Sequence, residues 1–116
     1  MFIQFNRKED HKTETDSAMI LIRSGPRGED LPGPVIKKGG VWITLGMTVT
    51  PDGSVHYYAH EGVGKLTQRD HLYSGRPYGY DAMQVNTFFF NVVNQDDGRT
   101  WSTRWIVDDT EVYVLH

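Results

Sequence analysis

Hydrophobic and polar residues alternate along residues 41–50, and the alternation resumes along residues 54–60. A period of two residues predicts β-strands that bury one face and expose the other. Between the two runs, Thr50-Pro51-Asp52-Gly53 supplies the residues of a tight turn, with Gly53 at the left-handed position. The pattern therefore predicts a β-hairpin with one apolar and one polar face.

The turn also predicts the register of this hairpin. A three-residue loop with a bulge sets Thr50 opposite Ser54. The pairs that follow are Val49 with Val55, Met47 with Tyr57, Leu45 with Ala59, Thr48 with His56, Gly46 with Tyr58, and Thr44 with His60. The apolar residues of both strands then share one face, and the two histidines flank Tyr58 on the other.

The remaining pattern indicates an all-β chain. Further strands are expected at residues 1–5, 18–23, 85–93, 101–107 and 111–115, with Gly98 left-handed in the turn of a second hairpin. Residues 6–17 are charged and predict an exposed connection or a turn of helix. Residues 24–40, rich in glycine and proline, predict a loop. Residues 61–83 predict a long irregular segment with one helical turn capped by Thr67.

Size and composition narrow the classes of protein. A chain of 116 residues is large enough for one domain, so we expect a single β-sandwich domain over residues 1–116, built from two antiparallel sheets. The net charge of −3 argues against a nucleic-acid partner. No apolar run approaches the roughly 20 residues of a membrane helix, and the first residues lack the order of a signal peptide. The chain has no cysteine and therefore no disulfide, so its cysteine content does not indicate whether it works in an oxidising or a reducing compartment.

Three segments resemble the concanavalin A-like jelly rolls, the group of laminin G-like lectin modules and glucanases. They are WITLGMTVTPDGSVHYYAHEG at residues 42–62, the phenylalanine-rich strand at residues 88–92, and WIVDDTEVYV at residues 105–114. The resemblance covers roughly residues 41–115 and implies a jelly-roll-like sandwich that is short for its family. It implies carbohydrate recognition rather than hydrolysis, because the paired glutamates of the glucanases are absent. A lectin-like module would be extracellular or on the cell surface.

Aromatic and hydrogen-bonding residues gather in residues 73–81. Sugars present C–H faces and hydroxyl edges, so their sites combine aromatic rings with planar polar groups. The predicted ligand-binding residues are Tyr73, Arg76, Tyr78, Tyr80 and Asp81 of this loop, with Tyr58 and His60 of the exposed strand face. The alternative interpretation is structural: the loop tyrosines plug the end of the sandwich, and Tyr58 packs over Gly46 on a solvated face.

Two carboxylate pairs could bind calcium, which prefers several oxygen ligands. Asp96-Asp97 precedes a glycine, as is usual in hairpin turns. The resemblance to the jelly rolls implies Asp108 and Asp109 as the preferred metal candidates, because they lie near that group's aspartate-containing close. His56 and His60 are four residues apart, about 13 Å along a strand, and cannot chelate one ion together. Calcium is therefore the one cofactor that the sequence leaves open.

No catalytic motif such as G-x-S-x-G, H-E-x-x-H or a phosphate loop occurs, so the sequence does not predict an enzyme. The predicted function is a non-catalytic binding module for carbohydrate. The alternative is a structural or assembly subunit that docks another protein through the same exposed aromatic residues. The expected partner is accordingly a glycan or another protein subunit, within a possible oligomer.

Overall fold

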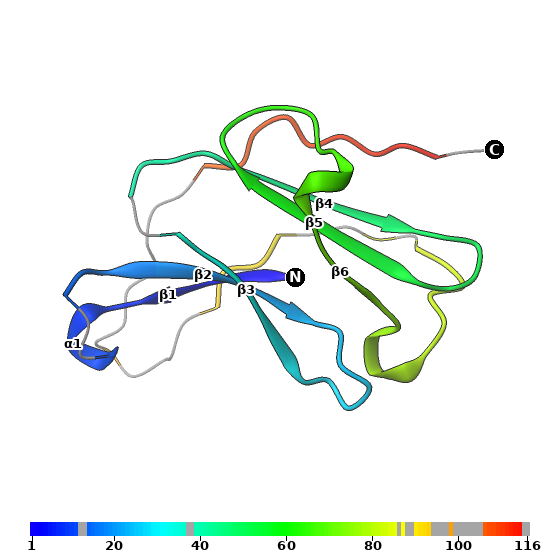
Figure 1. Cartoon of the computed structure of the whole chain (residues 1–116), viewed down its shortest axis with the longest axis horizontal. Coiled ribbons are helices and arrows are strands. Elements are labelled where there is room, and N and C mark those ends of the chain that lie inside the picture. The colour runs from blue at the N-terminus through cyan, green and yellow to red at the C-terminus, as the bar shows by residue number, and fades with distance from the viewer. Residues whose placement is uncertain are drawn as a thin grey trace. The chain divides into compact units, whose positions relative to one another are not determined.

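The computed structural model describes residues 1–11, 14–36, 39–85, 87, 90–93, 98 and 106–114. Contacts between residues divide the chain into two compact units, Met1–Asn86 and Thr87–His116. The strands of the described residues all belong to the first unit. They form two three-stranded antiparallel sheets, with strand orders β1-β2-β3 and β4-β5-β6 (Figure 1). The all-β class is confirmed, whereas a single domain over residues 1–116 stays a prediction.

The first sheet begins with two strands that the sequence predicts. β1 spans Phe2–Asn6 and pairs with β2, Ser17–Arg23. The charged connection between them contains one helical turn, α1, at Lys8–His11. Ile20 and Ile22 of the central strand β2 are both only 2% exposed, so this strand supplies much of the buried surface.

The third strand corrects the expectation of a loop over residues 24–40, because Asp30–Ile36 forms β3. Pro32 and Pro34 have no backbone N–H to donate, and a central strand needs such donors on both sides. β3 lies at the edge of the sheet, where one side needs no donor. The pairing shifts opposite Ile20, where a Cβ on Gly33 would lie 2.9 Å from the Ile20 carbonyl oxygen. Two hydrogen bonds from Arg23 to the Asp30 carboxylate, of 2.8 and 2.9 Å, join the ends of β2 and β3.

The second sheet contains the predicted hairpin. β4 spans Ile43–Val49 and β5 spans Val55–Glu61, and all six residue pairs predicted between them are confirmed. The turn also agrees: Gly53 has φ 82°, and the Thr50 N–H donates to the Ser54 carbonyl at 3.0 Å. Alternation and turn chemistry act independently, so their agreement specifies a single register.

The third strand of this sheet, β6, spans His71–Gly75 and corrects the expectation that residues 61–83 are irregular. The expected helical turn is present as the 3₁₀ helix η1, Gln68–Asp70, with Thr67 as its N-cap. A second 3₁₀ helix, η2, follows at Pro77–Gly79. Tyr73 therefore lies in a strand opposite Tyr57, and the loop that carries Arg76, Tyr78, Tyr80 and Asp81 begins after Gly75.

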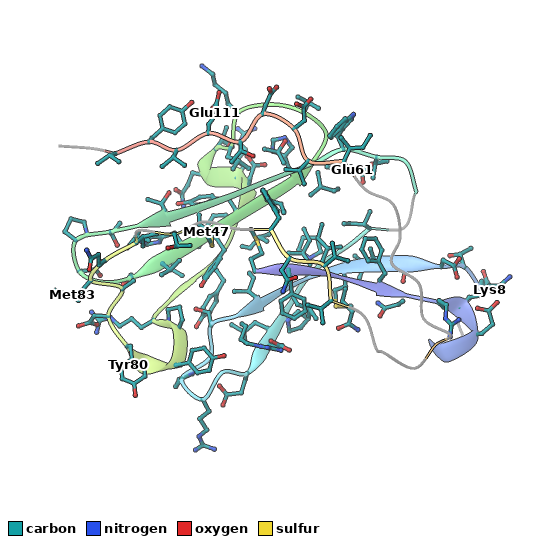
Figure 2. The ribbon with its side chains drawn as sticks, turned by 180° about the vertical axis from the view of Figure 1, so that it is seen from behind. Lys8, Met47, Glu61, Tyr80, Met83 and Glu111 are labelled. Carbon is teal, nitrogen blue, oxygen red and sulfur yellow. The ribbon has the colours of Figure 1, made fainter. Side chains whose placement is uncertain are left out.

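The two sheets share one hydrophobic cluster. Ile22 of β2 lies with Val55 and Tyr57 of β5, and Leu72 and Tyr73 of β6 pack against them. The apolar face of the hairpin is therefore buried along β5. Along the edge strand β4 the same face is open, and its exposed residues are Leu45 at 37%, Met47 at 49% and Val49 at 36% (Met47 is labelled in Figure 2).

Of the strands predicted after residue 84, most of residues 101–107 lies outside the described residues, which exclude 86, 88–89, 94–97, 99–105 and 115–116. The described residues 85, 87, 90–93 and 106–114 contain no regular strand, so the strands predicted at 85–93 and 111–115 are not formed over these residues. Gly98 has φ 67°, the left-handed conformation expected of it. No helix among the residues with described placement is long and apolar enough to cross a membrane.

Candidate binding face on β5 and β6

A β-bulge builds the polar face of the second sheet. The β5–β6 register shifts between Tyr57, opposite Tyr73, and Tyr58, opposite His71, so β6 carries one extra residue. Leu72 and Tyr73 therefore both pack toward the core, although adjacent residues of a regular strand point to opposite faces. As a result, His71 and Ser74 lie on the same outer face.

Ser74 is the centre of a hydrogen-bonded network on this face. Its Oγ lies 2.7 Å from Nδ1 of His56 and 2.6 Å from Nε2 of His71. Nε2 of His56 lies 3.0 Å from the hydroxyl of Thr50, the first residue of the hairpin turn. Tyr58 joins the group through an edge-on contact with the His71 ring, with centroids 5.3 Å apart. Both histidines and Tyr58 are half-buried, and Ser74 is exposed.

Asp52 anchors the turn end of the network. Its carboxylate accepts hydrogen bonds from the Thr50 hydroxyl, from the Ser54 hydroxyl at 2.8 Å and from the Ser54 N–H at 3.2 Å. These bonds, led by that of Thr50 and aided by the Arg76 charge, lower the pKa of Asp52 to about 2. Asp52 is consequently ionised at neutral pH and can only accept hydrogen bonds.

The ionised Asp52 determines where the network protons lie. The one hydroxyl hydrogen of Thr50 has two acceptors nearby, the ionised Asp52 carboxylate and the Ser54 carbonyl at 3.3 Å, so we assign Nε2 of His56 as the donor to Thr50. In neutral His56 the other nitrogen, Nδ1, is then an acceptor and takes the hydrogen of Ser74. Ser74 in turn accepts from Nε2–H of His71. The donors run in one direction, from His71 through Ser74, His56 and Thr50 to Asp52.

The segment between β5 and β6 covers the other end of the face. Asp70 accepts hydrogen bonds from the N–H and hydroxyl of Thr67 and lies 3.3 Å from His60 Nδ1, and these contacts, led by the Thr67 N–H, lower the pKa of Asp70. Leu66 lies over Gly46, where an added Cβ would stand 2.3 Å from Leu66 Cδ1. The predicted site residue His60 is thus held beside the Asp70 carboxylate at the covered end.

Arg76 and Asp81 of the predicted site bind each other and the hairpin turn. Arg76 Nε lies 3.0 Å from the Asp81 carboxylate, and Arg76 Nη2 donates to the Asp52 carbonyl at 3.0 Å. The Ala82 N–H donates to the Gly53 carbonyl at 2.9 Å. These contacts use both charged side chains to fasten residues 76–82, named here the latch loop, to the turn.

The tyrosines of the predicted site occupy three different environments. Tyr73 packs on the core cluster. Tyr78 adopts a left-handed φ of 57°, and its ring lies against Gly28, where a Cβ would stand 2.3 Å from a ring carbon. Tyr80 is 77% exposed and points away from the ribbon (Figure 2). The structure therefore groups Tyr58 with the histidine network and does not group it with the loop tyrosines.

The metal candidates Asp108 and Asp109 are exposed, and the Asp109 N–H donates to the Asp108 carboxylate at 3.0 Å. Within the described ranges, no group of three or more histidine, cysteine, aspartate or glutamate residues is arranged to hold a metal ion. Calcium binding by this pair stays a prediction.

Sequence reasoning missed His71 and Ser74. The alternation along β5 correctly places His56, Tyr58 and His60 on one face, whereas the bulge removes that signal from β6. Searches against protein-family models, curated proteins and solved structures find no match to this chain. The concanavalin A-like resemblance is neither supported nor contradicted by them, and the interpretation of the face depends on its geometry.

Proposed function

We propose that this chain is a carbohydrate-binding module whose ligand lies on the outer face of β5 and β6. The observation that carries the proposal is the grouping of Tyr58 with His56, His71 and Ser74 in one half-exposed network. An aromatic ring beside fixed donors and acceptors suits the C–H faces and hydroxyl groups of a sugar.

The network also favours binding because its side chains are held in place before a ligand arrives. Each mobile polar side chain that becomes ordered on binding costs about 0.5–1.5 kcal/mol. His56 is already fixed at both ring nitrogens, and His71 is fixed through Nε2. The loop residues Arg76 and Asp81 would first have to leave each other, so they are weaker candidates for ligand contacts.

The proposal includes a jelly-roll-like sandwich of the concanavalin A-like type. Two features support it: two antiparallel sheets, and a core cluster to which β2 and β5 both contribute. Such a sandwich would present one sheet face to the solvent and to a glycan, which is the arrangement proposed for β5 and β6.

A glycan array probed with the whole chain, with calcium and again with EDTA, tests the proposal, followed by calorimetric titration of the best glycan. Replacing Tyr58 by leucine removes the hydroxyl and the aromatic ring and should weaken binding at least about tenfold, which corresponds to about 1.4 kcal/mol. The matched control is Tyr80→Ala, which changes an exposed tyrosine outside the network and should leave affinity within about twofold.

A blank array from a folded sample would overturn the proposal, and so would a glycan whose affinity is unchanged by Tyr58→Leu. Loss of binding in Tyr80→Ala alone would instead move the site to the latch loop. Loss of binding in EDTA would show that a metal ion is needed and would make Asp108 and Asp109 the first residues to replace.

A second candidate function, an assembly subunit, is favoured by the edge strand β4. Its neighbour is β5 on one side, it carries no charged residue, and Leu45, Met47 and Val49 are exposed along it. Uncharged exposed edge strands readily pair with another chain. Sedimentation velocity would show oligomers that Met47→Lys dissolves, whereas a monomer at all concentrations would argue against assembly with copies of itself.

A further inference from the structure

We propose that Ser74 is a nucleophile, activated by His56, that takes up an acyl group from an activated carboxylic ester. This inference goes beyond glycan binding and does not depend on it. It concerns one covalent reaction per molecule, so a binding module could carry it.

The argument begins with the three-part arrangement around His56. An activated serine has a base within hydrogen-bond reach, and a third group orients that base. Here Ser74 Oγ lies 2.7 Å from His56 Nδ1, and His56 Nε2 is held 3.0 Å from the Thr50 hydroxyl. The direction of the donors leaves Nδ1 unprotonated and facing the serine hydroxyl, as a base must be.

Asp52 and His71 support this arrangement from its two ends. The ionised Asp52 accepts from Thr50 and so keeps the Nε2 proton on His56. His71 is a positioning residue, because its Nε2–H occupies an acceptor site of Ser74 at 2.6 Å and leaves the serine hydrogen directed toward His56.

The covalent step is balanced with these groups. Ser74 Oγ attacks the carbonyl carbon of the ester while its proton moves to His56 Nδ1. The tetrahedral adduct collapses and the bond to the leaving oxygen breaks. An alkoxide takes the proton from His56 and leaves as the alcohol, whereas a phenolate leaves as the anion and His56 passes the proton to solvent. The products are O-acylated Ser74 and the alcohol, with no change in oxidation state. Ser74 is exposed, so an ester can reach it.

The test treats the folded whole chain with p-nitrophenyl acetate and locates acetyl groups by peptide mass spectrometry. Ser17 of β2 and Ser54 of the turn serve as internal comparison serines. We expect Ser74 to be acetylated at least about 100-fold faster than either, which is the usual gain from a positioned base. Denaturant should abolish this preference, since it separates β5 from β6.

Variants distinguish activation from simple exposure. His56→Gln should slow acetylation of Ser74 about 100-fold, Thr50→Val about tenfold, and Thr50→Ser, which keeps the hydroxyl, less than about threefold. Equal acetylation of Ser74, Ser17 and Ser54 in the folded wild-type chain overturns the proposal without any variant. A fast Ser74 that is unaffected by His56→Gln overturns it as well.

Discussion

The outer face of β5 and β6 and the latch loop contain similar side chains, yet they differ in what those side chains bind. On the strand face, His56 uses both ring nitrogens within the network, whereas Nδ1 of His71 and one lone pair of Ser74 are left over from these bonds. In the loop, Arg76 and Asp81 use their charges on each other and on the hairpin turn. The comparison teaches that a cluster of polar and aromatic residues predicts a site only when its partners within the fold are known.

The largest effect is expected where the latch loop meets the turn, at Gly53. It has φ 82°, and a Cβ there would stand 2.5 Å from Asp81 Cβ. Gly53→Ala should therefore lower the free energy of unfolding by about 2–3 kcal/mol, from the left-handed backbone and the close contact together. Chemical denaturation measures the change.

Gly40→Ala is the matched control for this substitution. Gly40 has φ 71°, and among the described residues nothing lies within 4 Å of its added Cβ. It should cost only the backbone strain, about 1 kcal/mol. Equal losses in the two variants would mean that the loop is not fastened to the turn as described.

A smaller effect is expected from Arg76→Gln, which removes the charge that joins Asp81 to the turn. The side chains of both partners are 50% exposed, so the loss of stability should be about 1 kcal/mol or less. If the loop is structural, affinity for a glycan found by the array should stay within about twofold. A folded Arg76→Gln variant that no longer binds would reverse the comparison and make the loop the site.

Acid should weaken the turn through Asp52, whose pKa is lowered from its ordinary 3.8 to about 2 in the folded chain. Because the folded chain binds this proton less readily than the unfolded chain, the stabilisation is present above about pH 4. It is lost as the pH falls toward about 2. Denaturation curves measured from pH 5 to pH 2, in steps of about one pH unit, give the free energy of unfolding at each pH. This free energy should fall less for Asp52→Asn than for the wild type. If the free energy of unfolding fell equally with pH in both proteins, Asp52 would not be the group through which acid weakens the turn.

The smallest effect is expected from Tyr80→Ala in the latch loop. Since Tyr80 is 77% exposed, its removal should change the free energy of unfolding by no more than about 0.5 kcal/mol. Thermal unfolding checks this value. A larger loss would contradict the exposed position of this ring and weaken the contrast between Tyr80 and Tyr58.

The sequence predicts the β4–β5 hairpin because two independent signals, alternation and turn chemistry, require the same pairing. It does not predict β3, since Pro32 and Pro34 are compatible with a strand only at a sheet edge, and edge position is a property of the whole fold. β6 escapes prediction because the bulge at Leu72 breaks its period of two.

The candidate site was predictable to the same extent as its strands. Tyr58 and His60 follow from the alternation of β5, whereas His71 and Ser74 require the pairing of β6. The partners of Arg76 and Asp81 could not be foreseen, because they depend on the turn at residues 50–54 lying beside residues 76–82. Local patterns describe neighbours in the chain, and these contacts join segments about 25 residues apart.

The bulge in β6 lets two residues that are three positions apart share one face of the strand. In a strand of strict alternation that kept Leu72, His71 and Ser74 would point to opposite faces. Deleting Leu72 would instead leave them two positions apart, so both would stay on the outer face while the core lost the Leu72 side chain. In an evolutionary series, the face would therefore survive the loss of the Leu72 codon, because the bulge accommodates that residue.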